Sequence, residues 1–310
     1  MSAVPAAYTP NLTDGRTDTI TQVGSTVVLG GTFTSVTPHG SSTTFPDQFI
    51  TEFTAGTGAR VASFAPSVNG DVDTLAPGPT AGTVYVGGTF STIDGVTSKL
   101  ALISTTTGAI VPGWTSPKIN GAVNSIVLSG GQLYVGGYFA TVGGKSHIGL
   151  VVLNPTTGAV SPTVTPAFVG HHNYNRLCIP SARTTCASAG TGIKAMDINP
   201  AGNRLITIGN FTTAGGLARD QIALIDLAPS SVTVDPNWAT AAYSAECIAS
   251  AYDTYMRDVQ FSLDGSYFAV VATGGGAGSK NSDGTPTSCD STARYETATT
   301  GSDVRPTWID

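Results

Sequence analysis

A short phrase that recurs along the chain constrains its fold more than any other feature. Gly-Gly-x-Phe, preceded by an aliphatic residue, occupies residues 29–33, 86–90 and 135–139, and a reduced copy stands at 208–211. Each copy lies inside a longer unit of roughly fifty residues, and a period in that range is typical of solenoids and propellers. A unit rich in Gly, Thr and Val builds a scaffold, so the phrase predicts architecture and says little about chemistry.

The third unit shows how one repeat is built. Residues 122–128, 132–139 and 148–153 are runs rich in Val, Ile, Leu and Tyr, and a shorter run follows at 159–164. Gly-containing turns separate the runs, as in an antiparallel meander. One meander leaves its faces uncovered, so copies must stack, and a radial stack of four-stranded sheets is a propeller. No helical periodicity persists, so we predict an all-β fold, a β-propeller of four-stranded antiparallel blades.

Five such repeats follow one another in what we predict to be a single propeller domain. Their approximate bounds are 16–66, 68–117, 119–167, 190–240 and 252–309, and the fifth lacks the Gly-Gly phrase. Residues 1–15 align with the end of the first repeat and are expected to be the last strand of a preceding blade. Residues 170–190 form an insertion loop. Because both ends bring the same last strand, we expect a larger propeller, with a closed five-bladed ring as the alternative.

The position of the glycines suggests a structural role for them. A Gly pair just past a strand permits positive φ or the close approach of a neighbouring sheet. The Phe that follows is expected to pack between adjacent blades. Phosphate binding is the functional alternative, but no glycine-rich phosphate motif followed by a helix is present in the sequence.

The low charge of the chain excludes several classes of function. Only 11% of the residues are charged, and the net charge is −6. Nucleic acids and anionic membranes both require clustered Lys and Arg, so neither partner is expected. No run approaches the roughly 18–20 apolar residues of a membrane-spanning helix, and the N-terminus carries no signal-peptide pattern. We expect a monomer without membrane insertion, whose partner is a glycan or a cell-surface protein.

The cysteines indicate the redox environment. All four lie in the second half of the chain, at Cys178, Cys186, Cys247 and Cys289. An even number in a Lys-poor chain rich in Thr, Ser and Gly is typical of disulfide-bonded proteins from oxidising compartments. We predict the pairs Cys178–Cys186 and Cys247–Cys289, since each would close one irregular segment. Other connectivities and four free thiols are the alternatives, and no metal site is predicted because no paired Cys/His spacing is present.

The repeats resemble those of a known group of proteins. The Gly-Gly-x-Phe phrase, a Thr-Gly turn and a closing Pro/Trp segment are similar to propeller repeats of secreted actinobacterial proteins of unassigned function, related to the delta-60 repeats. Segments 171–176, 218–226 and 255–265 add to the resemblance, which covers nearly the whole chain. The resemblance implies secretion, a larger multidomain parent with further blades beyond Asp310, and no established catalytic residues. The missing signal peptide departs from it and is explained if Met1 begins a fragment or a mature chain.

One position of the repeat is polar in every unit. Aligning the first strands places Asp18, Asp73, Asn124, Lys194 and Asp258 at equivalent sites. The first strand is innermost in most propellers, so these side chains would encircle a central channel. Such a ring would bind a cation, water or a sugar hydroxyl, and a structural Ca²⁺ is left open. The competing interpretation is that they hydrogen-bond neighbouring backbone at the strand entry.

The insertion loop holds the densest group of side chains suited to binding. They are His171, His172, Asn173, Tyr174 and Arg176. Paired His with Asn and Tyr would ligate a metal or bind a glycan. Adjacent His side chains point differently and the loop lacks a carboxylate, so the competing interpretation is a polar loop pinned by Cys178–Cys186.

Together these features favour an extracellular, non-catalytic propeller that serves as a binding or display scaffold, with ligand contacts at one rim or at the channel mouth. One alternative is a glycoside hydrolase with Asp73 and Asp258 in the channel. Acids are scarce and no nucleophile motif accompanies the histidines, so we predict neither catalytic residues nor a cofactor. The other alternative is a purely structural module of a larger surface protein.

Overall fold

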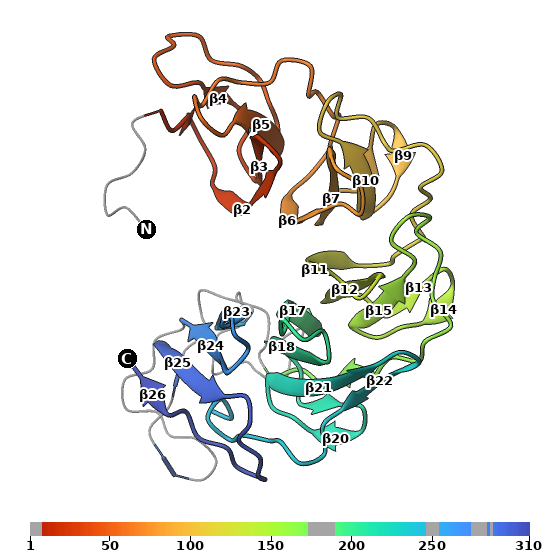
Figure 1. The fold of residues 1–310 in the computed structure, drawn as a ribbon, viewed down its shortest axis with the longest axis vertical. Helices are drawn as coiled ribbons and strands as arrows, with labels where there is room; N and C mark the ends of the chain where they lie inside the picture. The colour runs from red at the N-terminus through yellow and green to blue at the C-terminus, as the bar shows by residue number, and fades with distance from the viewer. Residues whose placement is uncertain (1–7, 173–189, 246–253, 274–283, 286–287) are drawn as a thin grey trace, which may run out of the picture. The chain divides into compact units, whose positions relative to one another are not determined.

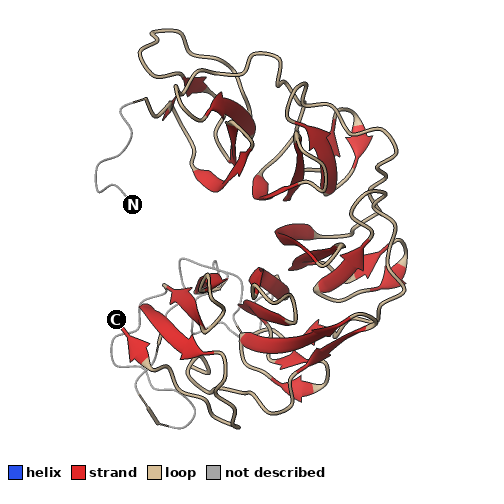
Figure 2. Cartoon of the chain, in the orientation of Figure 1, coloured by secondary structure: helices blue, strands red, loops and turns tan. Residues whose placement is uncertain are grey.

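The chain folds into a series of small antiparallel sheets. In the computed structural model, the described residues are 8–172, 190–245, 254–273, 284–285 and 288–310. Within these ranges every regular element is a strand, so the all-β prediction is confirmed (Figure 2). The same ranges contain no helix long and apolar enough to cross a bilayer.

Two compact units make up the chain. One comprises Met1–Leu133 and Leu153–Val160, and the other comprises Tyr134–Val152 and Ser161–Asp310. The division falls within the third repeat. Each unit is described by itself.

Three sheets follow the first three repeats in the predicted meander order. They consist of β2 (Thr17–Val23), β3 (Thr26–Gly31) and β5 (Ile50–Thr54); β6 (Val72–Pro77), β7 (Thr83–Gly88) and β10 (Leu100–Ser104); and β11 (Ala122–Ser129), β12 (Gln132–Tyr138) and β15 (Leu150–Leu153). In the first unit the first strands lie side by side, β2 against β6 and β6 against β11 (Figure 1).

Two four-stranded sheets follow in the second unit. The fourth repeat has β17 (Gly192–Ile198), β18 (Arg204–Asn210), β21 (Ile222–Ala228) and β22 (Ser231–Val234), and the fifth has β23 (Met256–Phe261), β24 (Tyr267–Ala272), β25 (Ser291–Glu296) and β26 (Trp308–Ile309). Here too the first strands of consecutive repeats, β17 and β23, pack together.

Short strands also pair outside the main sheets, and of these the sequence predicted a strand only at the segment that contains β1. They pair as β1 (Asn11–Leu12) with β4 (Val36–Thr37), β8 (Thr92–Ile93) with β9 (Val96–Thr97), β13 (Thr141–Val142) with β14 (Lys145–Ser146), and β16 (Phe168–Val169) with β19 (Thr213–Ala214) and β20 (Leu217–Ala218). β1 contains the residues that the sequence assigns to the last strand of a preceding blade.

The fourth strand is shorter than predicted in the first three repeats. There the fourth segment makes a single bridge to the third strand, at Arg60, Ile110 and Val160. The backbone turns away immediately afterwards. In the second repeat, for example, the N–H of Trp114 donates to the carbonyl of Val111 at 3.1 Å. Four full strands therefore describe only the fourth and fifth sheets.

The first glycine of the recurring phrase makes room for the next repeat. A β-carbon on Gly30 would lie 2.5 Å from Cγ1 of Val72, and one on Gly87 would lie 2.6 Å from Cγ1 of Val123. Neither glycine has a positive φ. Of the two predicted reasons for the glycine, close approach by a neighbouring sheet is therefore the correct one at these positions.

The phenylalanine of the phrase is buried in all four copies. Phe33, Phe90, Phe139 and Phe211 are at most 3% exposed. Phe90 shares an apolar cluster with Phe64, which comes from the end of the preceding repeat. For this copy, the predicted packing at the junction of two repeats is confirmed.

A turn of one repeat rests on the segment that closes the repeat before it. The N–H of Thr115, which follows the buried Trp114, donates to the carbonyl of Thr157 at 3.0 Å. In the second unit, the N–H of Ala239 donates to the carbonyl of Gly301 at 2.9 Å. Removing a buried aromatic side chain typically costs about 3–5 kcal/mol, so such closures contribute substantially to the stability of each junction.

Candidate binding surfaces

Most residues of the predicted polar ring lie at β-bulges. The pairing register between the first two strands shifts by one residue and leaves Asp18, Asp73 and Lys194 as the extra residue. A β-bulge re-aims a side chain and is over-represented beside functional sites. The sequence alignment thus identified a common structural position in these three repeats.

The second glycine of the phrase accommodates the bulge. A β-carbon on Gly31 would lie 2.1 Å from the carbonyl oxygen of Arg16, and one on Gly88 would lie 2.1 Å from that of Asp71. Any side chain here would therefore collide with the backbone of the first strand. The Gly-Gly pair and the bulge are parts of one local structure.

The fifth repeat corrects the alignment by one residue. Met256 pairs with Ala272 and Asp258 pairs with Val271, so the extra residue of the bulge is Arg257. Asp258 is exposed, and its Oδ1 accepts the backbone N–H of Val259 at 2.9 Å. Arg257 and Asp258 are adjacent polar residues in this strand. Likeness of residue type to the other repeats favours Asp258 for the bulge position, whereas the strand pairing places Arg257 there. The placement of Asp258 at the common position is therefore wrong.

The carboxylates at the bulges of the first unit lie close to an arginine. Arg16 Nε donates to Asp18 Oδ1 at 2.6 Å, and this hydrogen bond raises the pKa of Arg16, with smaller contributions from Asp71 and Asp73. A cation bound here would have to compete with the guanidinium. Among the residues that the structure describes, no group of three or more His, Cys, Asp or Glu side chains is arranged to hold a metal ion.

The remaining ring residues are divided between the two units. Asn124 is half-buried on β11 in the first unit, and Lys194 is half-buried on β17 in the second. Asp18 and Asp73 belong to the first unit and Asp258 to the second. Binding by the ring as a whole therefore stays a prediction.

In the insertion loop, His172 is held by hydrogen bonds. Its Nδ1 lies 2.6 Å from Asp220 Oδ1, its Nε2 lies 2.8 Å from the carbonyl oxygen of Ala245, and its side chain is 6% exposed. Its backbone N–H donates to Asn210 Oδ1 at 2.8 Å. Asn173, Tyr174 and Arg176 lie outside the described residues. The structure therefore brings His172 to a polar cluster of the fourth repeat, whereas binding by the loop stays a prediction.

The two partners of the His172 ring occupy both of its nitrogens. A carboxylate and a carbonyl oxygen are hydrogen-bond acceptors, so a ring N–H of His172 has an acceptor within reach on either side. In this arrangement His172 serves as a structural link rather than as a metal ligand.

Sequence reasoning missed the groups that surround His172. The Tyr255 ring meets the His172 ring edge-on, with centroids 6.0 Å apart. Burial, with a smaller effect of Asp220, raises the pKa of Tyr255, so its phenol stays neutral. Gln221 is fully buried and donates to the carbonyl of Tyr243 at 2.8 Å. Asp220 and Gln221 adjoin each other in the sequence, but nothing in the spacing indicates that they lie near residue 172.

Of the four cysteines in the predicted disulfides, the structure describes only Cys289. Cys289 is disulfide-bonded and 3% exposed. Cys178, Cys186 and Cys247 lie outside the described residues. The pairings Cys178–Cys186 and Cys247–Cys289 therefore stay predictions.

The fifth sheet has one apolar and one polar face. The apolar face packs into a core cluster that includes Trp238 and Tyr243. Asp258, Val271 and Thr292 stand directly opposite one another across three strands, as do Arg294 and Trp308 across two, and opposite residues share one side of a sheet. We call the side that carries Asp258, Gln260, Val271, Thr292, Arg294 and Trp308 the outer face.

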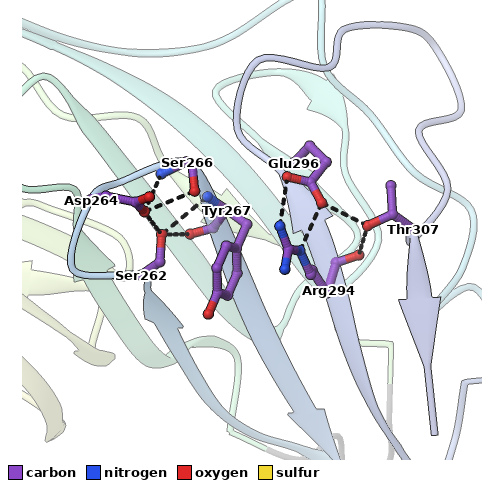
Figure 3. Close-up of polar contacts among 7 residues, drawn as sticks. All are labelled: Ser262, Asp264, Ser266, Tyr267, Arg294, Glu296 and Thr307. Atoms are coloured by element: carbon purple, nitrogen blue, oxygen red, sulfur yellow. Dashed lines mark hydrogen bonds and ion pairs between the residues drawn. The ribbon is translucent and has the colours of Figure 1, made fainter.

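Arg294 organises the outer part of this face. Its Nε donates to Glu296 Oε1 at 2.7 Å, and its guanidinium carbon lies 3.8 Å from the centre of the Tyr267 ring. Figure 3 shows Thr307 on the other side of Glu296, where its hydroxyl donates to Oε1 at 2.9 Å. The hydrogen bond between Arg294 and Glu296 lowers the pKa of Glu296 and raises the pKa of Arg294. Cation–π contact and ion pair together fix the guanidinium in one orientation.

A polar turn adjoins this group at the junction of β23 and β24. Asp264 Oδ1 accepts the Ser262 hydroxyl at 2.7 Å, the Ser266 N–H at 3.0 Å and the Ser266 hydroxyl at 2.8 Å (Figure 3). These hydrogen bonds, that from Ser262 foremost, lower the pKa of Asp264 to about 2. Leu263 at the tip is fully exposed. The turn is a local structural motif that holds a permanent negative charge near the outer face.

Comparison with known proteins gives a likeness of fold only. No family model and no curated protein sequence matches the chain. The structure is similar to a chain of Kuenenia stuttgartiensis hydrazine synthase, with a TM-score of 0.50 and 15% identity over 91% of this chain and 63% of that one. At this identity the likeness concerns architecture and carries no activity across.

Two other solved structures are less similar. The computationally designed Ika8 protein matches with a TM-score of 0.44 and 10% identity over 91% of this chain and 58% of its own. A chain of the Mitotic Checkpoint Complex matches with a TM-score of 0.44 and 14% identity over 83% of this chain and 60% of its own. This chain spans less than two thirds of each of the three structures.

Proposed function

We propose that this protein is a secreted β-propeller that acts as a non-catalytic scaffold for binding or display. The recurring contact between consecutive first strands, β2 with β6 and β6 with β11 in one unit and β17 with β23 in the other, supports the propeller. Blades arranged around an axis bring their first strands together in this way. Loops and free faces of such a scaffold are available for ligands without a catalytic centre.

The observation that favours a non-catalytic role is how two of the predicted ring acids are engaged. Asp18 pairs with Arg16, and Asp258 accepts its neighbour's N–H. Each of these two carboxylates therefore has a structural partner. A hydrolase needs instead a protonated acid and a free carboxylate that face each other across a substrate.

Asp197 comes nearest to the acid that the hydrolase alternative requires. Burial raises its pKa, and Asp258 adds a smaller effect in the same direction. Its two oxygens, however, accept the N–H groups of Ile198 at 2.9 Å and Phe261 at 2.7 Å. The second of these bonds joins β17 to β23, so Asp197 serves as a link between the fourth and fifth repeats.

The test measures binding and cleavage in one sample. The protein is incubated with neutral hexasaccharides of glucose, mannose and galactose and with a panel of cell-surface proteins. We expect saturable binding to a member of either set, with every sugar recovered intact by chromatography. Cleavage that is lost in Asp73→Asn or Asp258→Asn would establish the hydrolase instead. A complete lack of binding would favour the purely structural module.

A further inference from the structure

We propose that the outer face of the fifth sheet is a binding site for a neutral oligosaccharide. This inference rests on the proposed binding function and names one surface and one class of ligand for it. Three observations support it. Polar residues stand where other repeats have buried apolar ones, the indole of Trp308 is exposed, and the face is small and nearly neutral.

The outer face of the fifth sheet differs from the equivalent face of the other sheets at the positions where those sheets contact the next repeat. On the second strand, the residue paired with the first residue after the bulge is Gly30 or Gly87 in the first two repeats and Val271 in the fifth. Its partner on the third strand is Ile50 in the first sheet and Ile222 in the fourth, where both are buried.

In the fifth sheet these third-strand positions are polar. Thr292 stands where Ile50 and Ile222 stand, and Arg294 stands where the fourth sheet has the buried Leu224. The guanidinium of Arg294 is paired with Glu296 and its side chain is 41% exposed. On this sheet the face therefore offers polar groups to water and to polar ligands.

An exposed indole lies on this polar face. Trp308 is 51% exposed and stands directly opposite Arg294, whereas Trp114 and Trp238 are at most 6% exposed. The face of an aromatic ring carries partial negative charge and attracts the C–H groups of a sugar ring. Val271, 39% exposed, is a second apolar side chain on the same face, two strands away from Trp308.

Size and charge select the ligand. Four strands about 4.8 Å apart and three positions about 6.8 Å apart span an area of about 200 Å². A stable protein interface needs about 800 Å² on each partner, so the face suits a few sugar rings better than a protein. Arg294 is offset by Asp258 and Glu296, so the small negative excess disfavours a polyanion. Gln260, Asp258 and Arg294 supply donors and acceptors for hydroxyl groups, which act as both.

The experiment titrates the neutral hexasaccharides of glucose, mannose and galactose into the full chain and follows heat and tryptophan fluorescence. We expect Trp308→Ala to weaken binding of the preferred sugar at least about tenfold, as loss of a hot-spot side chain does, and Gln260→Ala to weaken it severalfold. Trp308→Phe should keep part of the affinity. Val164→Ala is the matched control, because Val164 is 81% exposed and belongs to the third repeat rather than to the fifth sheet.

The outcomes separate this inference from the proposed function. Undiminished sugar binding by folded Trp308→Ala and Gln260→Ala would overturn the site and leave the binding function intact. Binding of a cell-surface protein without any hexasaccharide would overturn the ligand class while the scaffold role stands. Failure to bind any member of either panel would overturn both. Thermal melting of each variant verifies that it is folded.

Discussion

Val72 of the second repeat lies against Gly30 of the first so closely that a β-carbon on Gly30 would be 2.5 Å from Val72 Cγ1. The contact recurs between Gly87 and Val123. A glycine that the sequence repeats is thus explained by a side chain that belongs to the next repeat.

Gly30→Ala should destabilise the first unit. Overpacking of a well-filled core typically costs about 1–3 kcal/mol, and here Val72 would have to move. Gly56→Ala is the matched control, since a β-carbon there meets no atom within 4 Å and its φ is ordinary. Urea denaturation should show a clear loss for Gly30→Ala and almost none for Gly56→Ala. Equal stability of the two variants would refute the close contact.

Glu52 should be a source of instability. It is 1% exposed, neither carboxylate oxygen has a hydrogen-bond partner within the described part of the chain, and Leu102 and Leu224 occupy the equivalent position in other sheets. A buried polar group without a hydrogen-bond partner costs about 1–3 kcal/mol, and a charged one costs more, so a hydrophobic residue in its place removes that cost. We expect a gain of that order for Glu52→Leu near neutral pH.

The gain should depend on pH. Burial raises the pKa of Glu52 above its ordinary value of 4.5, and a smaller effect of the Thr26 side chain acts in the opposite direction. The folded state therefore holds the proton more tightly than the unfolded state, and the penalty grows as pH rises from about 4.5 through the folded pKa. Urea titrations across this range should show the advantage of Glu52→Leu shrinking at low pH. An advantage that is constant with pH would contradict the titration of Glu52.

The link between His172 and Asp220 should contribute to stability. Nδ1 of His172 lies 2.6 Å from Asp220 Oδ1, and Asp220→Asn removes the carboxylate from this contact. We expect urea denaturation to show a loss of about 1–3 kcal/mol, less than for a fully buried pair because Asp220 is partly exposed. Unchanged stability of Asp220→Asn would disprove the link.

Asp264 should titrate far below an ordinary aspartate. The hydrogen bonds from Ser262 and Ser266 lower its pKa to about 2, so the stabilisation they provide is present above pH 3.8 and is lost as pH falls toward 2. Carboxyl NMR of the intact protein measures the midpoint directly. In Ser262→Ala the midpoint should rise toward 3.8, and an unchanged midpoint would show that the Ser262 hydroxyl is not responsible.

The sequence predicted what depends on local pattern. Alternating apolar runs and Gly turns identify the strands, and the Gly-Gly phrase marks a common bulge next to Asp18 and Asp73. Features that depend on strand pairing could not be predicted from the sequence. Arg257 rather than Asp258 occupies the bulge of the fifth repeat because of the register between β23 and β24. The fourth strands of the early repeats are short because the chain turns toward a neighbouring repeat.

Contacts between distant segments were beyond the reach of the sequence. The link from His172 to Asp220 joins an insertion to a strand entry, and no periodicity indicates it. The outer face became recognisable only when strand pairing placed Trp308 opposite Arg294. Either residue alone, in an irregular repeat near the end of the chain, looks like ordinary surface.

The central proposal is that the five repeats form one propeller, and small-angle X-ray scattering tests it most directly. A single compact domain of 310 residues should have a radius of gyration of about 20 Å and a distance distribution with one maximum. A two-lobed distribution with a radius well above that value, about 25 Å or more, would contradict it, because the repeats would then form separate bodies.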